Sequence, residues 1–295
     1  MTKSSYLRLA RVTRAMKRIP GAVLMLEHIR RAFAGSNETI RVHDFDGSLT
    51  LDLCLNEHMQ SQIFWYGFYS RDIVLALDRL LSPGMVVLDV GANIGEVSLC
   101  AAKRVGTKGC VFSFEPMPEI YRTLKKNFSL NHMSQAHPID IGISDAEGEA
   151  PIYRADSMFK DGTQHLGLGT LYPMAGRNTP VKTIRLTTID AFAASHQLNR
   201  VDLIKVDAEG AELKALIGGD QTLRKLKPSV ILELQRDSAE ASGCSAGEIL
   251  EYLNHHRYSV FTIGRNAKLH ALERNNLKSF QNILCIPPCR KPNHE

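Results

Sequence analysis

The chain has 295 residues, of which 44% are hydrophobic and 23% are charged, and its formal net charge is +5. A chain of this size and composition can bury a sizeable core, which excludes a disordered protein and favours one globular domain with additions. No stretch is long and apolar enough to cross a bilayer, and the first residues lack the apolar segment and cleavage site of a signal peptide. We therefore expect a cytoplasmic protein.

The positive charge is concentrated in the first residues. Residues 1–31 contain eight lysines and arginines against one acidic residue, Glu27, so this arm carries +7 and the rest of the chain −2. A slightly acidic body argues against a broad phosphate-binding face, and no specific nucleic-acid partner is expected.

Apolar residues recur among the basic residues of this arm and predict an amphipathic helix. They are Leu7, Leu9, Val12, Ala15, Met16 and Ile19. We favour a helix that packs on the domain with a solvated basic side over peripheral contact with a membrane or another partner, which stays an alternative.

Residues 61–80 are predicted to form one helix that ends at Ser82-Pro83-Gly84. Its first part is aromatic (Phe64, Trp65, Tyr66, Phe68 and Tyr69) and its second part has apolar residues at helical spacing. Core packing is expected for most of these rings, although some could line an active site. We expect residues 1–80 to form a basic helical extension and lead-in, residues 81–290 the main domain, and residues 291–295 a tail.

The next segment reads as a buried strand that turns into a helix through Asp89-Val-Gly91-Ala-Asn93-Ile-Gly95. Glycines at such a turn let the backbone approach a ligand closely. A dinucleotide fold would have glycine in place of Asn93, and a phosphate-binding loop would have lysine directly after Gly95. The acidic residues Asp89 and Glu96 suit the amino group and sulfonium of S-adenosylmethionine better than a pyrophosphate.

The following strand, residues 110–115, ends in Glu115. In α/β nucleoside-binding folds, an acidic residue about twenty positions after the glycine turn binds the two ribose hydroxyls. Glu115 has this place, and as a carboxylate it can accept both hydroxyl protons. A helix over residues 118–131 and a third strand over residues 138–143 are predicted next.

Residues 154–180 are rich in glycine and have few periodic apolar positions, which predicts a long irregular segment. Loops of this length in a compact domain are usually functional lids or disordered. The candidate substrate contacts in this segment are Asp161, His165, Thr170 and Tyr172. A histidine titrates near neutrality, but a lone loop histidine is more often a solvated surface group, so His165 is a minor candidate.

A fourth strand, from Val201, leads into Lys205-Val-Asp207-Ala-Glu209-Gly-Ala-Glu212. Strand alternation puts Lys205 and Asp207 on one side of the sheet. A buried lysine needs an anionic partner or loses its charge, and Asp207 or Glu233 could be that partner. Strands over residues 230–233, 258–263 and 282–286 complete the sheet, and a capping box at Ser245 and Glu248 opens a helix to residue 255.

Five of these segments together resemble the FkbM-type S-adenosylmethionine-dependent methyltransferases of the class I superfamily. The Lys-x-Asp-x-Glu-Gly-x-Glu string is the most specific of them, and the resemblance extends over about residues 60–290. The segments are Asp89–Gly95, Phe114-Glu115-Pro116 with Leu124–Asn127, Gly142–Asp145 with Gly148, Ile204–Glu212, and Leu232-Glu233.

The resemblance implies an α/β, Rossmann-like fold, with a seven-stranded, mostly parallel sheet and helices on both faces. It implies S-adenosylmethionine as the cofactor, held by Asp89, Gly91, Asn93, Gly95 and Glu115. It places adenine beside Ile143 and Ser144. It also implies methylation of a hydroxyl on a sugar or another small molecule.

The sulfonium is already a good leaving group, and holding the acceptor oxygen, the methyl carbon and the sulfur in line supplies much of the rate. A hydroxyl, however, is a poor nucleophile until its proton is removed. We hypothesise that Asp207 accepts this proton, that Lys205 stabilises the developing alkoxide and that Glu209 orients the substrate. Further candidates for substrate contact are His165, Tyr172 and Glu233.

Alternatives stay open for both the acidic residues and the activity. The acidic residues could instead form a structural ion-pair network or, ranked third, bind a divalent cation, so no metal is assigned. The Asp207-Ala-Glu-Gly sequence differs from the Asn/Asp-Pro-Pro-Tyr/Phe of enzymes that methylate amide or base nitrogens, which favours oxygen. A nucleoside-binding protein without turnover is the second hypothesis, and a nicotinamide oxidoreductase, disfavoured by Asn93, is the third.

Overall fold

The described part of the chain in this computed structural model comprises residues 2–16, 19, 21–33, 36–154, 161–164, 169–173, 178–235, 241–273 and 277–288. His165 and the predicted tail lie outside it. None of the helices within these ranges is long and apolar enough to cross a membrane.

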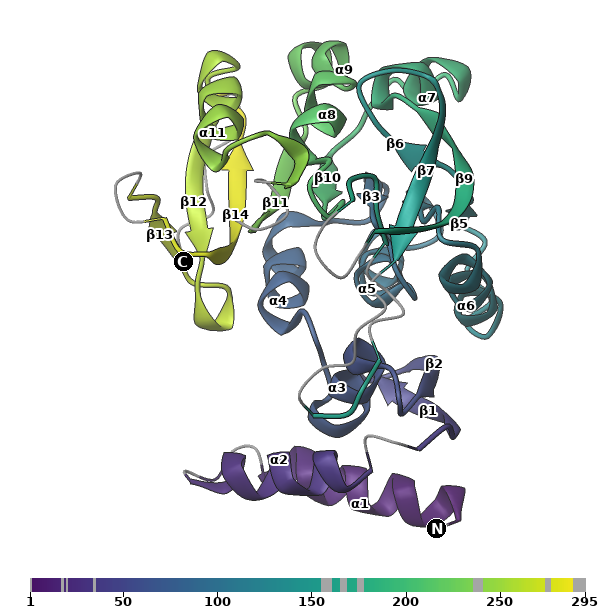
Figure 1. The fold of residues 1–295 in the computed structure, drawn as a ribbon. Coiled ribbons are helices and arrows are strands. Elements are labelled where there is room, and N and C mark those ends of the chain that lie inside the picture. Colours follow the sequence, from purple (N-terminus) through teal and green to yellow (C-terminus); the bar gives the residue numbers. More distant parts are fainter. Residues whose placement is uncertain are drawn as a thin grey trace.

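An eight-stranded sheet, in the order β13-β12-β14-β11-β10-β3-β4-β5, forms the centre of the described chain (Figure 1). The five strands from β11 to β5 are parallel, and β14 is antiparallel to both β11 and β12. The predicted seven-stranded, mostly parallel sheet is therefore confirmed, with β13 as a short additional edge strand. The bounds are β3 Val86–Val90, β4 Cys110–Phe114, β5 Ala136–Ile139, β10 Leu203–Val206, β11 Ser229–Gln235, β12 Ser259–Ile263, β13 Leu269–Ala271 and β14 Phe280–Ile286.

Helices cover both faces of this sheet, as expected for alternating strands and helices. Successive strand residues point to opposite faces, so Val87 and Leu203 belong to one apolar core and Leu88 and Ile204 to the other. The first core is covered by α4 (Arg71–Leu80), α5 (Glu96–Val105) and α6 (Pro118–Ser129). The second is covered by α7 (Ile189–Ser195), α8 (Glu212–Ile217), α9 (Asp220–Lys225) and α11 (Ala246–His255), whose predicted capping box is present. A 3-10 turn, η1 (Arg265–Ala267), precedes β13.

A second, four-stranded sheet lies beside the first, in the order β6-β9-β7-β8. Its strands are β6 (Gly142–Ile143), β7 (Gly148–Arg154), β8 (Gly169–Thr170) and β9 (Thr179–Thr187). The single strand predicted over residues 138–143 is wrong, because β5 ends at Ile139 and β6 pairs with β9 instead. The exposed β7 and β9 show little apolar alternation, and no sequence pattern therefore marked them.

The N-terminal extension consists of α1 (Lys3–Met16), α2 (Ala22–Ala32), a hairpin of β1 (Thr39–Phe45) and β2 (Leu49–Cys54), and α3 (His58–Tyr66). Helix α1 buries Tyr6, Ala10 and Thr13, and the Thr13 hydroxyl donates to the Trp65 carbonyl of α3 at 3.0 Å. The predicted helix is thus present and packs on α3 of the same extension, whereas the hairpin was not predicted. The hairpin is joined to α6, since the Asp52 amide donates to Asn127 Oδ1 at 2.9 Å.

The single helix predicted over residues 61–80 is wrong, because α3 ends at Gly67, whose φ is 93°. The next amides, of Tyr69 and Ser70, donate to the buried carboxylate of Glu96. Phe64 and Trp65 are fully buried, as expected for core rings, and Tyr69 is half exposed. The break therefore turns one aromatic residue out of the helix toward the cleft described below.

Candidate active site

A cleft opens at the carboxyl ends of β3, β4 and β10, the edge at which parallel α/β sheets bind ligands. It contains about 1180 Å³ of space, part of which is its open mouth. Eight of the predicted site residues line it: Gly91, Asn93, Glu115, Ile143, Lys205, Asp207, Glu209 and Glu233.

The glycine turn lies directly against the loop that follows β10. Gly91 has a φ of +74°, and a Cβ added to it would lie 1.8 Å from the carbonyl oxygen of Asp207. The amides of Gly91 and Ala92 both donate to the Phe114 carbonyl, at 3.0 and 2.9 Å. Glycine is therefore required here for its conformation and for the close approach of two loops. This approach brings the predicted cofactor turn and the predicted base to one wall.

Replacing Gly91 with alanine is expected to disrupt this wall. The left-handed conformation alone costs about 1–3 kcal/mol for a non-glycine residue, and the Asp207 backbone must also move. We expect calorimetry to show loss of S-adenosylmethionine binding and thermal denaturation to show a lower Tm. The matched control is Gly21→Ala, because Gly21 is also left-handed, with a φ of +81°, but has no atom within 4 Å of the added Cβ. Equal binding by both variants would contradict the prediction.

Glu115 is buried at the end of β4 and is held by the turn. Its carboxylate accepts hydrogen bonds from the amides of Asn93, at 3.0 Å, and Met117, at 2.9 Å. Burial raises the pKa of Glu115 to about 7, although the two amides oppose this shift. Each carboxylate oxygen has a second lone pair, so the residue can still accept the ribose hydroxyls.

S-adenosylmethionine affinity is expected to increase with pH through the pKa of Glu115. Below about 7 the carboxyl is protonated and has lost an acceptor site, whereas above it the carboxylate can accept both hydroxyls. If only the carboxylate binds, Kd is about tenfold higher at one pH unit below this pKa than on the plateau above it. Titration calorimetry across this range tests the dependence. The variant Glu115→Gln should bind weakly at every pH, and a wild-type-like pH dependence in it would contradict the assignment.

Lys205 is almost fully buried and links three parts of the site. Its Nζ donates to the Gly91 carbonyl at 2.8 Å and lies 3.3 Å from both Asp89 Oδ1 and Asp207 Oδ2. Burial alone lowers the pKa of Lys205, but the carboxylates of Asp89, Asp207 and Glu233 outweigh it and the pKa is raised. The ammonium is therefore charged, and it makes one hydrogen bond and two ion-pair contacts within the protein.

Asp89 and Gly95, both predicted to bind cofactor, support the turn from behind and do not line the cleft. Asp89 is opposite Lys205 in the sheet register, and its Oδ2 accepts from the Ser98 hydroxyl at 2.5 Å. Gly95 packs against α6, where an added Cβ would lie within 3 Å of Leu124 and Phe128. In the structure, Asp89 and Gly95 therefore make contacts within the protein behind the turn.

The loop after β10 and strand β11 contain acidic residues of two kinds. Some line the cleft, and one accepts hydrogen bonds from backbone amides. The Asp207 side chain is 35% exposed in the cleft. Burial and the carboxylates of Asp207 and Glu209 raise the pKa of Glu233 above its usual range. Glu212 accepts instead from the amides of Ala208 and Gly210, which makes it a structural residue of the loop. Within the described ranges, no three His, Cys, Asp or Glu side chains are arranged to hold a metal ion.

Four candidates from the sequence do not reach the cleft wall. Ser144, predicted beside adenine, is buried, and its hydroxyl donates to Asp145 at 3.0 Å. Tyr172 packs instead under Lys214, whose Nζ is 5.6 Å from the ring centre. Asp161 pairs with Arg30, and Thr170 donates to the Glu209 carbonyl. The structure therefore gives these side chains partners within the protein.

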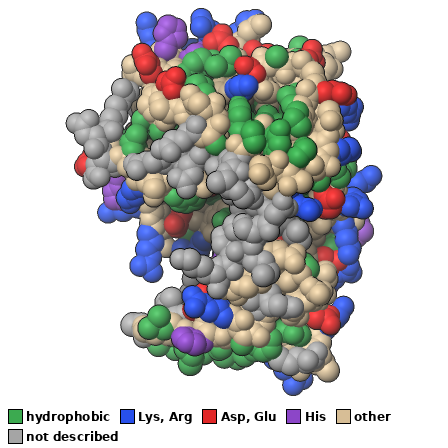
Figure 2. Space-filling view, viewed as in Figure 1, with side chains coloured by type: hydrophobic (Ala, Val, Ile, Leu, Met, Phe, Trp, Pro, Cys, Tyr) green, Lys and Arg blue, Asp and Glu red, His purple; other side chains and the backbone are tan. Residues whose placement is uncertain are grey.

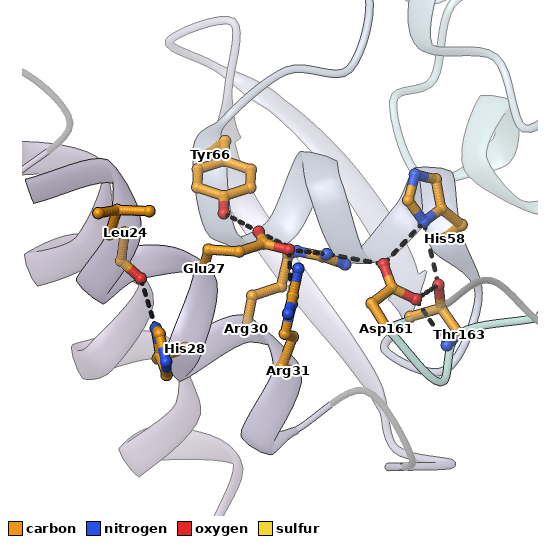
Figure 3. Close-up of polar contacts among 9 residues, drawn as sticks. All are labelled: Leu24, Glu27, His28, Arg30, Arg31, His58, Tyr66, Asp161 and Thr163. Atoms are coloured by element: carbon orange, nitrogen blue, oxygen red, sulfur yellow. Dashed lines mark hydrogen bonds and ion pairs between the residues drawn. The ribbon is translucent and has the colours of Figure 1, made fainter.

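The sequence missed the wall that the N-terminal extension supplies, which includes Glu57, His58 and Met59. His58 Nδ1 lies 3.2 Å from Asp161 Oδ2, and Asp161 lies 2.6 Å from Arg30 Nη2 on α2 (Figure 3). These contacts join the loop around Asp161 to α2 and α3. The only local signal was a polar Asn-Glu-His run before an aromatic helix, and no sequence pattern links it to residue 161.

Comparison with known families agrees with this geometry. The model of the methyltransferase FkbM domain matches residues 89–260, more than half of the chain and all of the sheet from the end of β3 to β12. The chain belongs to the FkbM methyltransferase family. A second model, of protein-L-isoaspartate(D-aspartate) O-methyltransferase, matches residues 4–151. The fold is the class I methyltransferase fold, and S-adenosylmethionine is the cofactor of this FkbM domain.

Three curated relatives are similar to the FkbM chain. The AMB antimetabolite synthetase AmbE of Pseudomonas aeruginosa is 30% identical, over 77% of this chain and 12% of its own length. The hexuronic acid methyltransferase AglP of Haloferax volcanii is 27% identical, over 56% of this chain and 62% of its own. The 2-O-methyltransferase NoeI of Sinorhizobium fredii is 26% identical, over 53% and 65%. The chain thus spans less than two thirds of each relative.

Proposed function

We propose that the protein transfers a methyl group from S-adenosylmethionine to a hydroxyl oxygen of a small-molecule or glycan acceptor, with Asp207 as the general base. The observation that carries this proposal is the position of the Asp207 carboxylate, which is exposed in the cleft on the same wall as Gly91. The names of AglP and NoeI, one a hexuronic acid methyltransferase and the other a 2-O-methyltransferase, support a sugar hydroxyl.

The residues of the cleft suit this chemistry. When bound, S-adenosylmethionine supplies an activated methyl group. Glu115 holds the ribose hydroxyls, the turn at Gly91 and Asn93 gives the cofactor a close backbone surface, and Ile143 gives adenine an apolar one. Asp207 removes the proton from the acceptor hydroxyl as the new O–C bond forms.

Lys205 has a different role in this proposal from the one expected from the sequence. Its ammonium is directed at Gly91, Asp89 and Asp207 and is almost fully buried, so it orients the Asp207 carboxylate instead of touching an alkoxide. Glu233 and Glu209 both line the cleft and can hydrogen-bond to the acceptor. Together they would orient a polyhydroxylated acceptor.

Label transfer tests the proposed reaction. The protein is incubated with methyl-labelled S-adenosylmethionine and fractions of cell extract, and labelled products are tested for methyl ether linkage. We expect label in a small-molecule or glycan fraction and none with heat-denatured protein. Calorimetric binding of S-adenosylmethionine without label transfer to any fraction would favour the nucleoside-binding hypothesis. Binding of NAD in its place would favour an oxidoreductase.

We further propose a cytoplasmic location, because S-adenosylmethionine is available there. Fractionation of cells that express the tagged chain tests it. Recovery of the chain outside the cytoplasm and its adjoining membrane surface would contradict it.

A further inference from the structure

Large apolar side chains are exposed on α1, on α2 and at Ile19, which lies between them. Seven such side chains are exposed in the described ranges, and four of them lie within residues 12–25. Figure 2 shows hydrophobic side chains gathered along the lower edge of the molecule, where Figure 1 places these two helices. Single exposed apolar residues are ordinary, but a cluster of them marks an interaction site. The four are Val12 (53% exposed), Ile19 (54%), Leu24 (75%) and Met25 (47%).

The same two helices are basic and have no exposed carboxylate. The exposed basic residues of the two helices are Lys3, Arg8, Arg11 and Arg31. Among the described residues before Phe33, the single acidic residue is Glu27, and its carboxylate accepts hydrogen bonds from Arg30, Arg31 and Tyr66 (Figure 3). The surface thus combines apolar side chains with a net positive charge.

The inner sides of both helices are fixed to the domain, so this exposure belongs to the folded state. Leu26 and Arg30 of α2 are buried, and Arg30 pairs with Asp161 beside the cleft (Figure 3). On α1, Thr13 and Arg14 donate to carbonyls of α3. The apolar residues therefore cannot turn inward without loss of these contacts.

We propose that this membrane face, made of the four apolar and four basic residues named above, docks on an anionic lipid surface. The apolar side chains would enter the acyl boundary, and the basic side chains would lie at the phosphate level. A nucleic acid would leave the apolar side chains without a partner, and a symmetric pairing of two copies would bring like charges together. This inference concerns a binding surface and is independent of the acceptor.

Vesicle co-sedimentation of the full chain tests the proposal. Vesicles of phosphatidylcholine alone are compared with vesicles that also contain phosphatidylglycerol, at low and high salt. We expect binding to the anionic vesicles, weaker binding at high salt and little binding to the neutral vesicles. Equal sedimentation with both kinds of vesicle, or with neither, would overturn the proposal.

A matched pair of variants locates the contact. Leu24→Glu introduces a carboxylate into the membrane face, whereas Ile217→Glu makes the same chemical change on α8, where the side chain is 43% exposed. We expect the partition coefficient of the first variant to fall by about tenfold and that of the second to stay within about twofold of the wild type. Thermal denaturation confirms that both are folded. An equal loss of vesicle binding in the two variants would contradict the location. Sedimentation equilibrium that shows a wild-type dimer, and dissociation of this dimer by Leu24→Glu, would also contradict it.

Discussion

Replacing Lys205 with methionine is expected to lower the free energy of unfolding by about 3–5 kcal/mol, because it removes the cation from a buried ion pair. Asp89 is almost fully buried, and its Oδ1 has Lys205 Nζ at 3.3 Å but no hydrogen bond. Without the ammonium, that carboxylate has lost its counter-ion in a site that excludes water. Urea denaturation of the wild type and the variant measures the change.

The double variant Lys205→Met/Asp89→Asn is the control for this prediction. It leaves no uncompensated charge at the Asp89 position, so it should recover much of the stability that the single variant loses. The amide introduced at this position would keep an oxygen to accept the Ser98 hydroxyl, which donates to Asp89 in the wild type. A loss below about 1 kcal/mol in Lys205→Met would show that the ion pair contributes little.

The main sheet and the cofactor side of the cleft could be predicted because their signals are local. Buried parallel strands are mostly apolar, and β3, β4 and β10 are apolar except for Asp89, Ser113 and Lys205. In a parallel sheet the carboxyl ends share one edge, so residues after different strands meet there. Gly91, Glu115 and Asp207 met for this reason.

The cleft wall that the N-terminal extension supplies could not be predicted because its contacts are not local. The wall at Glu57 and His58 belongs to the N-terminal extension, and no local pattern at the glycine turn indicates where that extension lies. Asp161, which contacts His58, comes from a loop about a hundred positions later in the chain. The break between α3 and α4 likewise depends on Glu96, a residue of another helix. Ser144 was predicted from the family resemblance, but its buried hydroxyl donates to Asp145 and it does not line the cleft.

The replacement of Asp207 with asparagine is expected to lower the rate of methyl transfer by about 10²–10⁴-fold, the usual contribution of a general base. An amide cannot take the hydroxyl proton, but its oxygen can still accept from Lys205 Nζ, which lies 3.3 Å from the carboxylate in the wild type. The affinity for S-adenosylmethionine should therefore change little. The rate is measured with the acceptor fraction that the wild type labels, and the affinity by calorimetry.

Glu209→Gln is the matched control, because it removes one charge from the same loop at a residue that also lines the cleft. If Glu209 only orients the acceptor, its variant should raise KM more than it lowers kcat, the reverse of Asp207→Asn.

A residual rate in Asp207→Asn that increases with pH would fit replacement of the lost base by hydroxide. Unimpaired turnover in Asp207→Asn would rule out the base. Equal losses of binding and rate would instead mean that Asp207 belongs to the ion-pair network around Lys205, in which case the cleft promotes transfer by alignment alone.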